Sequence, residues 1–431
     1  MSALFERLKS RDYRYEIIIK LILLFLFLMF TGRFIASLPP TLAHIVPQLF
    51  RNTTISFMVI LLLANWLIDR QIILKVKTGL THKFFLVSFL YWFLHVIGYF
   101  YSSNTKEAGF IIEKKLSLIL FPLIFATINL NETSKLNIYK WFVFLLLFFS
   151  STCMLYGMYH YKMTGDIKML SLEYSLYIDI HRVVMSMYLT LGAYFAFELH
   201  KQGRIKLAVL ILYLAISGAH ILLMASRLYM VVYLIFVCFL LYRYISSKKL
   251  LYGVMAFGLT LSFALGFVMY QTNKVFKSQI ETLFMGKKTS AANTNGVSER
   301  KYQWDAAMAL IIKHPIAGVG QGDVVDSLQQ EYKDMYWDIG YTHRYHAHNQ
   351  YLQTFIGLGL LGFISLVFMI FYPFVFYKQT GVEAKICSIL FGISLLTDNH
   401  TELQQSIVFM FLWLGMFINL KSSKRLQENT A

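Results

Sequence analysis

The feature that most constrains this chain is a series of apolar stretches, each long enough to cross a bilayer as a helix. The chain has 431 residues and is 57% hydrophobic with only 15% charged residues, too apolar for a soluble fold to bury. We therefore predict an all-α integral membrane protein with about twelve transmembrane helices. The stretches lie near 16–36, 53–68, 84–102, 114–129, 138–160, 182–199, 205–225, 228–245, 250–270, 350–377, 384–398 and 406–420.

The distribution of lysine and arginine predicts how these helices are oriented. Lysine and arginine cluster in every second connection between the apolar stretches. Because basic residues concentrate on the cytoplasmic side, these connections and both termini are predicted to be cytoplasmic. This topology accounts for the net charge of +17 better than nucleic-acid binding does, because the basic residues do not gather on one polar face. The first apolar stretch is longer than the core of a signal peptide, so we expect it to be retained as a helix.

One long polar segment interrupts the series. We divide the chain into helices one to nine at 1–271, a loop at 272–347 on the external side, and helices ten to twelve at 348–431, all within one integrated membrane domain. The loop balances its basic residues with acidic ones, and we expect it to form short amphipathic helices over the bilayer. The three cysteines lie within apolar stretches, so we predict neither a disulfide framework nor a cysteine metal site.

The loop contains a segment that could bind an anion. Arg300 lies four residues before Trp304, and a glycine-rich turn that includes Gly320 and Gly322 follows. An arginine offers a planar fork to phosphate oxygens, and glycines let backbone N–H groups approach an anion closely. Taken alone, the pattern more often indicates a surface arginine beside an ordinary turn, because glycine-rich turns are common in loops.

A histidine-rich segment ends the loop. His343, His346 and His348 are followed by Asn349 at the entry to the tenth apolar stretch. A zinc site would need further ligands, and no nearby cysteine or carboxylate supplies them, so we predict no metal. The start of a helix favours a neutral imidazole, which can accept a hydroxyl proton, so we expect His348 to act as a base. Interfacial histidines bonded to water are the alternative.

Two glycine patterns suggest nucleotide binding, and we reject both. The string from Gly357 to Gly362 has the spacing of a dinucleotide fingerprint but lies inside an apolar stretch, where it more plausibly allows close helix packing. The residues 286–289 resemble a phosphate loop, but Glu281 stands where its first glycine belongs.

Two further polar positions lie at membrane boundaries. Ser226-Arg227 ends the seventh stretch, where an arginine either snorkels to the interface or meets an anion. The residues 398–402 include Asp398, Asn399, His400 and Glu402 in the last external connection. These could face the same cleft, but we interpret them as a solvated loop.

Together these motifs resemble the superfamily of O-antigen ligases and Wzy-type O-antigen polymerases, which are membrane glycosyltransferases. His348-Asn349, then nine residues, then Gly359-Leu360-Leu361-Gly362 fits the ligase signature. Arg300, Trp304 and the stretch from Pro315 to Gly322 resemble the arginine–tryptophan and proline–glycine segment of the family. Ser226-Arg227 resembles its Ser-Arg-Gly segment, although Leu228 replaces the glycine.

The resemblance implies a GT-C-like fold and a specific reaction. A glycan would pass from undecaprenyl diphosphate to a sugar hydroxyl of lipid A-core, with inversion and with neither metal nor cofactor. The site would face the periplasm from a bacterial inner membrane, in contact with lipids and not with nucleic acid. By this resemblance His348, Arg300 and Arg227 are catalytic, and the substrate-binding residues are Asn349, Trp304, Gly320, Gly322 and His346.

Three alternatives remain open. An O-antigen polymerase would join lipid-linked repeats with similar arginines, and the His348 signature favours the ligase. An O-linked protein oligosaccharyltransferase shares much of the pattern, because the acceptor site is hard to identify from sequence. A transporter is expected to place ionisable residues deep in several helices, whereas Lys20, Arg33, His95 and His220 are scattered without an acidic relay.

Overall fold

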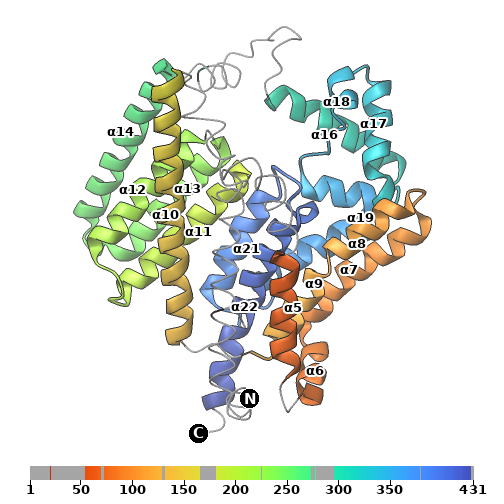
Figure 1. The fold of residues 1–431 in the computed structure, drawn as a ribbon, viewed down its shortest axis with the longest axis horizontal. Helices are drawn as coiled ribbons and strands as arrows, with labels where there is room; N and C mark the ends of the chain where they lie inside the picture. The colour runs from red at the N-terminus through yellow and green to blue at the C-terminus, as the bar shows by residue number, and fades with distance from the viewer. Residues whose placement is uncertain are drawn as a thin grey trace. The chain divides into compact units, whose positions relative to one another are not determined.

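A computed structural model shows a chain whose described regular elements are helices (Figure 1). The predicted first span at 16–36 lies outside the described residues except for Lys20, and most of 273–295 lies outside them too. The described residues are 20, 54–68, 72–128, 132–165, 181–224, 226–272, 277, 296–378 and 380–428.

The helices form two compact units. Unit 1 comprises 1–29, 48–135 and 300–431, and unit 2 comprises 30–47 and 136–299. Segments that are far apart in the sequence therefore meet within unit 1, where the last third of the chain packs against an early part.

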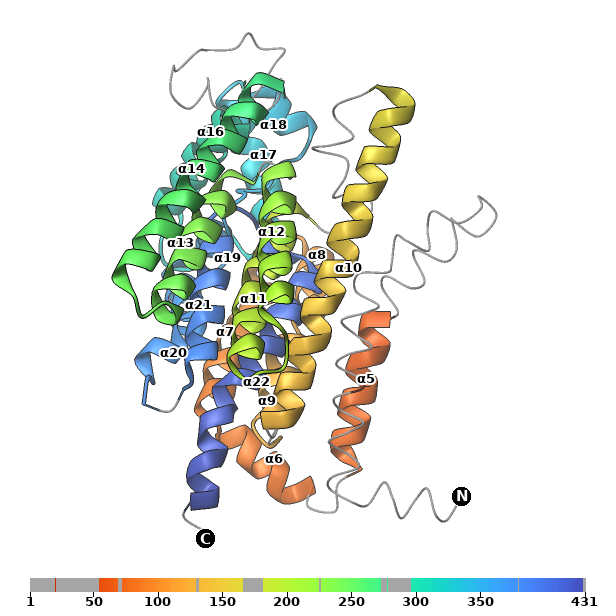
Figure 2. The same ribbon diagram turned by 90° about the vertical axis from the view of Figure 1, so that its left-hand side faces the viewer.

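Unit 2 is built around α11 (Arg182–Lys201), whose side chains are almost all buried. Phe195 of α11 stacks on Tyr139 of α10 with ring centroids 4.0 Å apart. The hydroxyl of Tyr213 on α12 donates a hydrogen bond of 3.0 Å to the Leu189 carbonyl of α11. Figure 2 shows α10 to α13 running alongside one another. The remaining bounds are α10 Glu132–Thr164, α12 Leu207–Leu223, α13 Arg227–Tyr244 and α14 Lys248–Thr272.

Unit 1 has an apolar centre in which α7 packs against α19, and α9 packs against α22. Phe84 at the start of α7 is completely buried and lies 5.1 Å from the Tyr372 ring and 6.4 Å from the Phe411 ring. These contacts hold early and late helices together. The bounds are α5 Thr54–Leu67, α6 Ile72–Thr81, α7 Lys83–Tyr101, α8 Thr105–Lys114, α9 Ser117–Phe125, α19 Gln350–Ile370, α20 Tyr372–Val375, α21 Val382–Ser394 and α22 Gln404–Glu428.

Four elements cap one end of unit 1, in the part of the chain where the sequence predicts the loop. They are α16 (Gly296–Lys313), which has 18 residues and is longer than the short helices expected, and the shorter η5 (Gln321–Asp323), α17 (Val324–Asp334) and α18 (Asp338–Thr342). Figure 1 shows α16, α17 and α18 together. A second apolar cluster lies between them and α19, and it is formed by Ala306, Ala307, Leu310, Ile311, Val324, Leu328, Tyr332, Trp337, Ala347 and Ile356. The placement of these elements outside the membrane stays a prediction.

A set of backbone hydrogen bonds joins this cap to α19. The N–H of Val319 donates to Ile356 O at 2.8 Å, and the N–H of Gly320 donates to Gly357 O at 3.2 Å. These carbonyls are available because α19 is interrupted at Gly359, which has φ +66° and ψ −161°. The N–H of Leu360 consequently leaves the helical pattern and donates to Pro315 O at 3.0 Å.

Glycine is required where the two segments meet. A Cβ on Gly359 would lie under 3.0 Å from the backbone of Ile316, and one on Gly318 would lie under 3.0 Å from the backbone of Ile356. Both glycines also have positive φ, which other residues rarely adopt. The expectation of close packing at 357–362 is correct, but the partner is the irregular segment after α16 and not a helix.

Most predicted apolar stretches coincide with helices, but fewer are long enough to count as spans. Within the described residues, five helices are long and apolar enough to cross a membrane: α7, α10, α11, α13 and α19. The stretch at 114–129 differs most, because the helix there, α9, has nine residues and contains Pro122. The prediction of twelve spans is therefore supported only in part.

We expect Gly359→Ala to lower stability by more than about 2 kcal/mol, because alanine at positive φ is strained and its Cβ has no room. Thermal unfolding in detergent measures the effect. Gly253→Ala is the matched control, since nothing lies within 4 Å of a Cβ there. Equal melting temperatures for the two variants would contradict the role assigned to the backbone contact.

Candidate functional site

The site is centred on His348, which precedes α19. Its Nδ1 lies 3.5 Å from Oδ1 of Asp398, and its side chain is 35% exposed. Its backbone has φ +45°, a left-handed conformation that is uncommon for residues other than glycine. Such conformations cost on the order of 1–3 kcal/mol and gather at functional sites. The ring is thus held beside a carboxylate.

Asp398 is positioned by a turn that folds against the start of α19. The N–H of Gln350 donates to Leu395 O at 2.8 Å, and its Oε1 accepts from the N–H of Thr401 at 2.9 Å. The turn is buried, with Asn399 5% and His400 0% exposed. The interpretation of 398–402 as a solvated loop is therefore wrong, because these polar residues lie between packed helices.

Arg300 reaches the same turn from α16. Its Nη2 donates a hydrogen bond of 3.2 Å to the carbonyl of Thr397, the residue before Asp398. The structure therefore brings together two of the predicted catalytic residues, Arg300 and His348, through a turn that the sequence analysis had not assigned to the site.

An exposed apolar stripe begins at Arg300 and follows α16. Trp304, Met308 and Ile312 recur every four residues and are 39%, 48% and 74% exposed. Residues four apart lie on one face of a helix, so the guanidinium stands at the head of this stripe. A ligand with an anionic head and an apolar tail fits that arrangement.

Asn349 acts as the N-cap of α19. Its Oδ1 accepts from the N–H groups of Tyr351 at 3.0 Å and Leu352 at 3.2 Å, which satisfies two donors that a helix start leaves open. The cap orients the residue before it, so Asn349 positions His348. His346 is exposed two residues earlier, beside this site.

The glycine turn does not form the anion cradle that the sequence suggested. The N–H of Gly320 donates to Gly357 O, and the N–H of Gly322 donates to Ser102 Oγ at 3.1 Å. The expected donors are used inside the fold, because the turn is needed to pack against α19 and the end of α7.

Arg227 belongs to unit 2, where it is the first residue of α13. The N-cap, Ser226, makes no side-chain capping bond. An arginine beside the open N–H groups of a helix start is suited to an anion. Arg300 and His348 both contact the turn at 397–398, whereas Arg227 is described only within unit 2.

A buried polar network lies beneath the turn and was not anticipated. Lys115 is fully buried, and its Nζ lies 3.0 Å from Oε1 of Glu402 and 2.8 Å from Nε2 of His95. The Nε2 of Gln350 donates to the same Glu402 oxygen at 3.3 Å. Because His95 Nδ1 faces the Tyr91 carbonyl at 2.9 Å, that nitrogen is the donor and Nε2 accepts from lysine.

The network fixes the charge state of Glu402. Burial opposes ionisation of this carboxyl, but the charge and the hydrogen bond of Lys115 outweigh burial and lower the pKa of Glu402. The ionised pair joins the segment after α8 to the turn that carries Asp398. No sequence pattern marks it, since Lys115 and Glu402 are 287 residues apart.

Residues 211–367 match the family described as O-antigen ligase. The match runs from α12 into α19 and includes Arg227, Arg300 and His348. No curated protein matches the chain. The resemblance predicted from the motifs is confirmed over these residues.

We expect Lys115→Met to destabilise the protein by about 3–5 kcal/mol, because it leaves the Glu402 carboxylate buried without its partner. Chemical unfolding in detergent measures the loss. Adding Glu402→Gln should recover most of it. Lys106→Met, at an exposed lysine on α8, is the control and should change stability by no more than about 0.5 kcal/mol. If Lys115→Met alone were as stable as Lys106→Met, the buried pair would not contribute to stability as proposed.

Proposed function

We propose that the protein ligates a glycan to lipid A-core, on the premise that residues 211–367 match the family described as O-antigen ligase. The donor is a glycan on undecaprenyl diphosphate, and the acceptor is a sugar hydroxyl at the periplasmic face of a bacterial inner membrane. The observation that carries the proposal is the convergence of His348, Asp398 and Arg300 on one turn.

The chemistry follows from the orientation of His348. The acceptor hydroxyl oxygen attacks the anomeric carbon while its proton passes to His348 Nε2, since Nδ1 faces Asp398. The new C–O bond forms as the bond to the diphosphate breaks, and the diphosphate leaves with the electron pair. Attack from the opposite face inverts the anomeric configuration. The Asp398 carboxylate orients the ring and stabilises the imidazolium that forms.

The departing diphosphate needs fixed positive charge. Arg300 supplies it beside the base, and its contact with Thr397 holds the guanidinium in place. Arg227, at an open helix start, is the second candidate for this role. If both arginines act on the diphosphate, their fixed positive charge takes the role that a metal ion would otherwise have on the phosphates.

The lipid portion of the donor fits the face of α16. A polyprenyl chain attached to a diphosphate at Arg300 would meet Trp304, Met308 and Ile312 in succession. Burying such side chains against an apolar chain is favourable, at roughly 25 cal/mol per Å². This stripe supports a lipid-linked donor over a soluble nucleotide sugar.

A deletion strain distinguishes the ligase from its relatives. We expect long glycan to accumulate on the carrier while lipid A-core stays bare, because transfer alone is lost. Lipopolysaccharide and carrier-linked glycan are both measured. Core that bears a single repeat would indicate a polymerase, and unchanged lipopolysaccharide with lost glycoproteins would indicate protein glycosylation.

We expect His348→Ala and Arg300→Ala to abolish detectable ligation in complementation while the proteins insert normally. Asp398→Asn should reduce the transfer rate about 10²–10⁴-fold, because the base loses its orienting carboxylate. His343→Ala is the control, since this exposed histidine belongs to the same segment but contacts the Ile339 carbonyl. Near-normal complementation by His348→Ala would contradict the proposed mechanism.

A further inference from the structure

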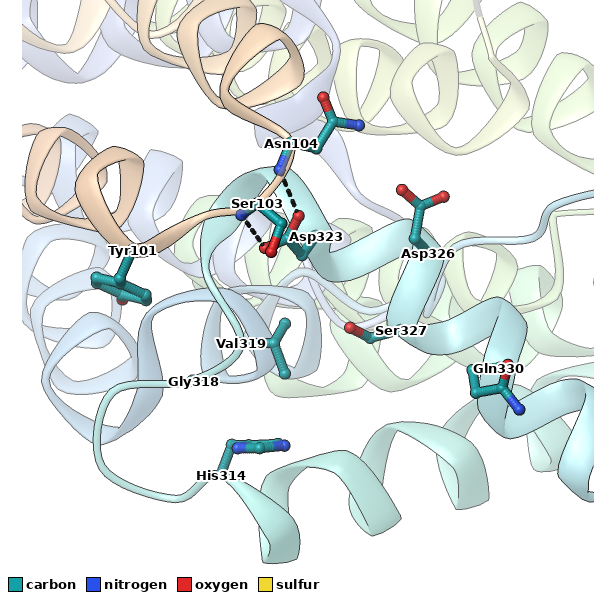
Figure 3. A pocket seen from close by; sticks show the side chains of 10 residues that line it. All are labelled: Tyr101, Ser103, Asn104, His314, Gly318, Val319, Asp323, Asp326, Ser327 and Gln330. Carbon is teal, nitrogen blue, oxygen red and sulfur yellow. Dashed lines mark hydrogen bonds between the residues drawn. The ribbon is translucent and has the colours of Figure 1, made fainter.

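A cavity of about 900 Å³ opens on unit 1 at the end of α16 remote from Arg300. Figure 3 shows it bordered by Tyr101 at the end of α7, by His314 and Val319 after α16, and by Ser327 on α17. No step of the proposed transfer uses these residues.

The walls of the cavity are fixed by contacts behind them. Both carboxylate oxygens of Asp323 accept backbone N–H groups, from Ser103 at 2.6 Å and from Asn104 at 2.8 Å (Figure 3). The Tyr101 hydroxyl donates to Ala317 O at 2.6 Å. The floor is the glycine turn, already held against α19. A pocket that is rigid before its ligand arrives is typical of a binding site.

The lining selects a class of ligand by its charge. Lysine and arginine are absent from the residues that border the cavity, which argues against a phosphate. The oxygens of Asp323 are occupied, and Asp326 pairs with Arg344, which argues against a cation. Apolar lipid is disfavoured because polar side chains predominate. A neutral polar molecule remains.

The polar groups match sugar hydroxyls. In the described part of the chain, the Ser327 hydroxyl and the His314 ring have no hydrogen-bond partner, and both can donate and accept. Gln330 and Asn104 add amides at the rim, and Tyr101 adds an aromatic ring that can pack on a pyranose face. Directional donors and acceptors around an aromatic surface suit an oligosaccharide.

The position of the cavity fits a long substrate. His314 follows Arg300 by 14 residues along α16, which separates them by about 20 Å along the helix axis. We propose that this cavity, formed by Tyr101, Asn104, His314, Ser327 and Gln330, binds the distal sugars of the lipid A-core acceptor. The acceptor is the substrate of choice because the lipid chain of the donor is assigned to the stripe that follows α16 from Arg300 toward this end. The proposal rests on the proposed glycan transfer and adds a subsite remote from the reacting bond. Asp326 and Arg344 join its rim to the segment that leads to His348.

The test measures binding and transfer with the full-length protein in lipid nanodiscs. The probes are free core oligosaccharide and the glycan released from the carrier. Ser327→Trp places a bulky side chain in the cavity beside His314, and the double variant His314→Ala/Gln330→Ala removes polar groups without added bulk. Lys333→Trp, an exposed position elsewhere on α17, is the matched control.

We expect both cavity variants to weaken binding of the core oligosaccharide by at least about tenfold, as losing one or two hydrogen bonds implies. The KM for the acceptor should rise in parallel, with kcat within about twofold. A loss confined to the glycan released from the carrier would contradict the assignment to the acceptor.

Unchanged affinity for both probes in both cavity variants would overturn the subsite, while transfer by the wild type would leave the proposed function standing. His348→Ala separates the two claims in the other direction. The His348→Ala protein should bind the oligosaccharide normally. If the wild type binds the oligosaccharide in a way that Ser327→Trp weakens, but does not transfer glycan, the proposed transferase is rejected and the glycan-binding site is retained.

Discussion

The backbone contact between the segment after α16 and the break in α19 is the constraint on which the site depends. Val319 and Gly320 donate to carbonyls that a continuous helix would have used itself, and Gly359 makes them available. This contact attaches α16, and therefore Arg300, to the helix that begins after His348. The apolar cluster between α16 and α19 and the hydrogen bond from Arg300 to Thr397 O act in the same direction.

A second constraint lies under the turn that carries Asp398. The buried Lys115–Glu402 pair and Gln350 hold this turn against the start of α19, and Asn349 caps the helix. Removing either partner of a buried pair is costly, so the turn has one stable arrangement. The left-handed backbone of His348 is sustained by these surroundings, and the ring faces a carboxylate as a result.

The sequence was sufficient for features that depend on local pattern and insufficient for those that depend on distant pairing. Apolar stretches located α7, α10 and α19, because lipid exposure leaves a continuous signal. The motif spacing predicted Arg300 and His348 as site residues, and the structure connects both to one turn. Asp398 was misjudged because a polar connection gives no sign that helices bury it. The partnership of the two glycine segments was also missed, since each one alone satisfies a local explanation.

The most direct measurement of the central claim is transfer by the purified protein in nanodiscs, with undecaprenyl-diphosphate-linked glycan and lipid A-core as its only substrates. We predict a glycosylated core of inverted anomeric configuration and free undecaprenyl diphosphate in equal amounts, formed in the presence of a chelator. Intact donor after incubation of folded protein with both substrates, or a product that retains the donor configuration, would contradict the account.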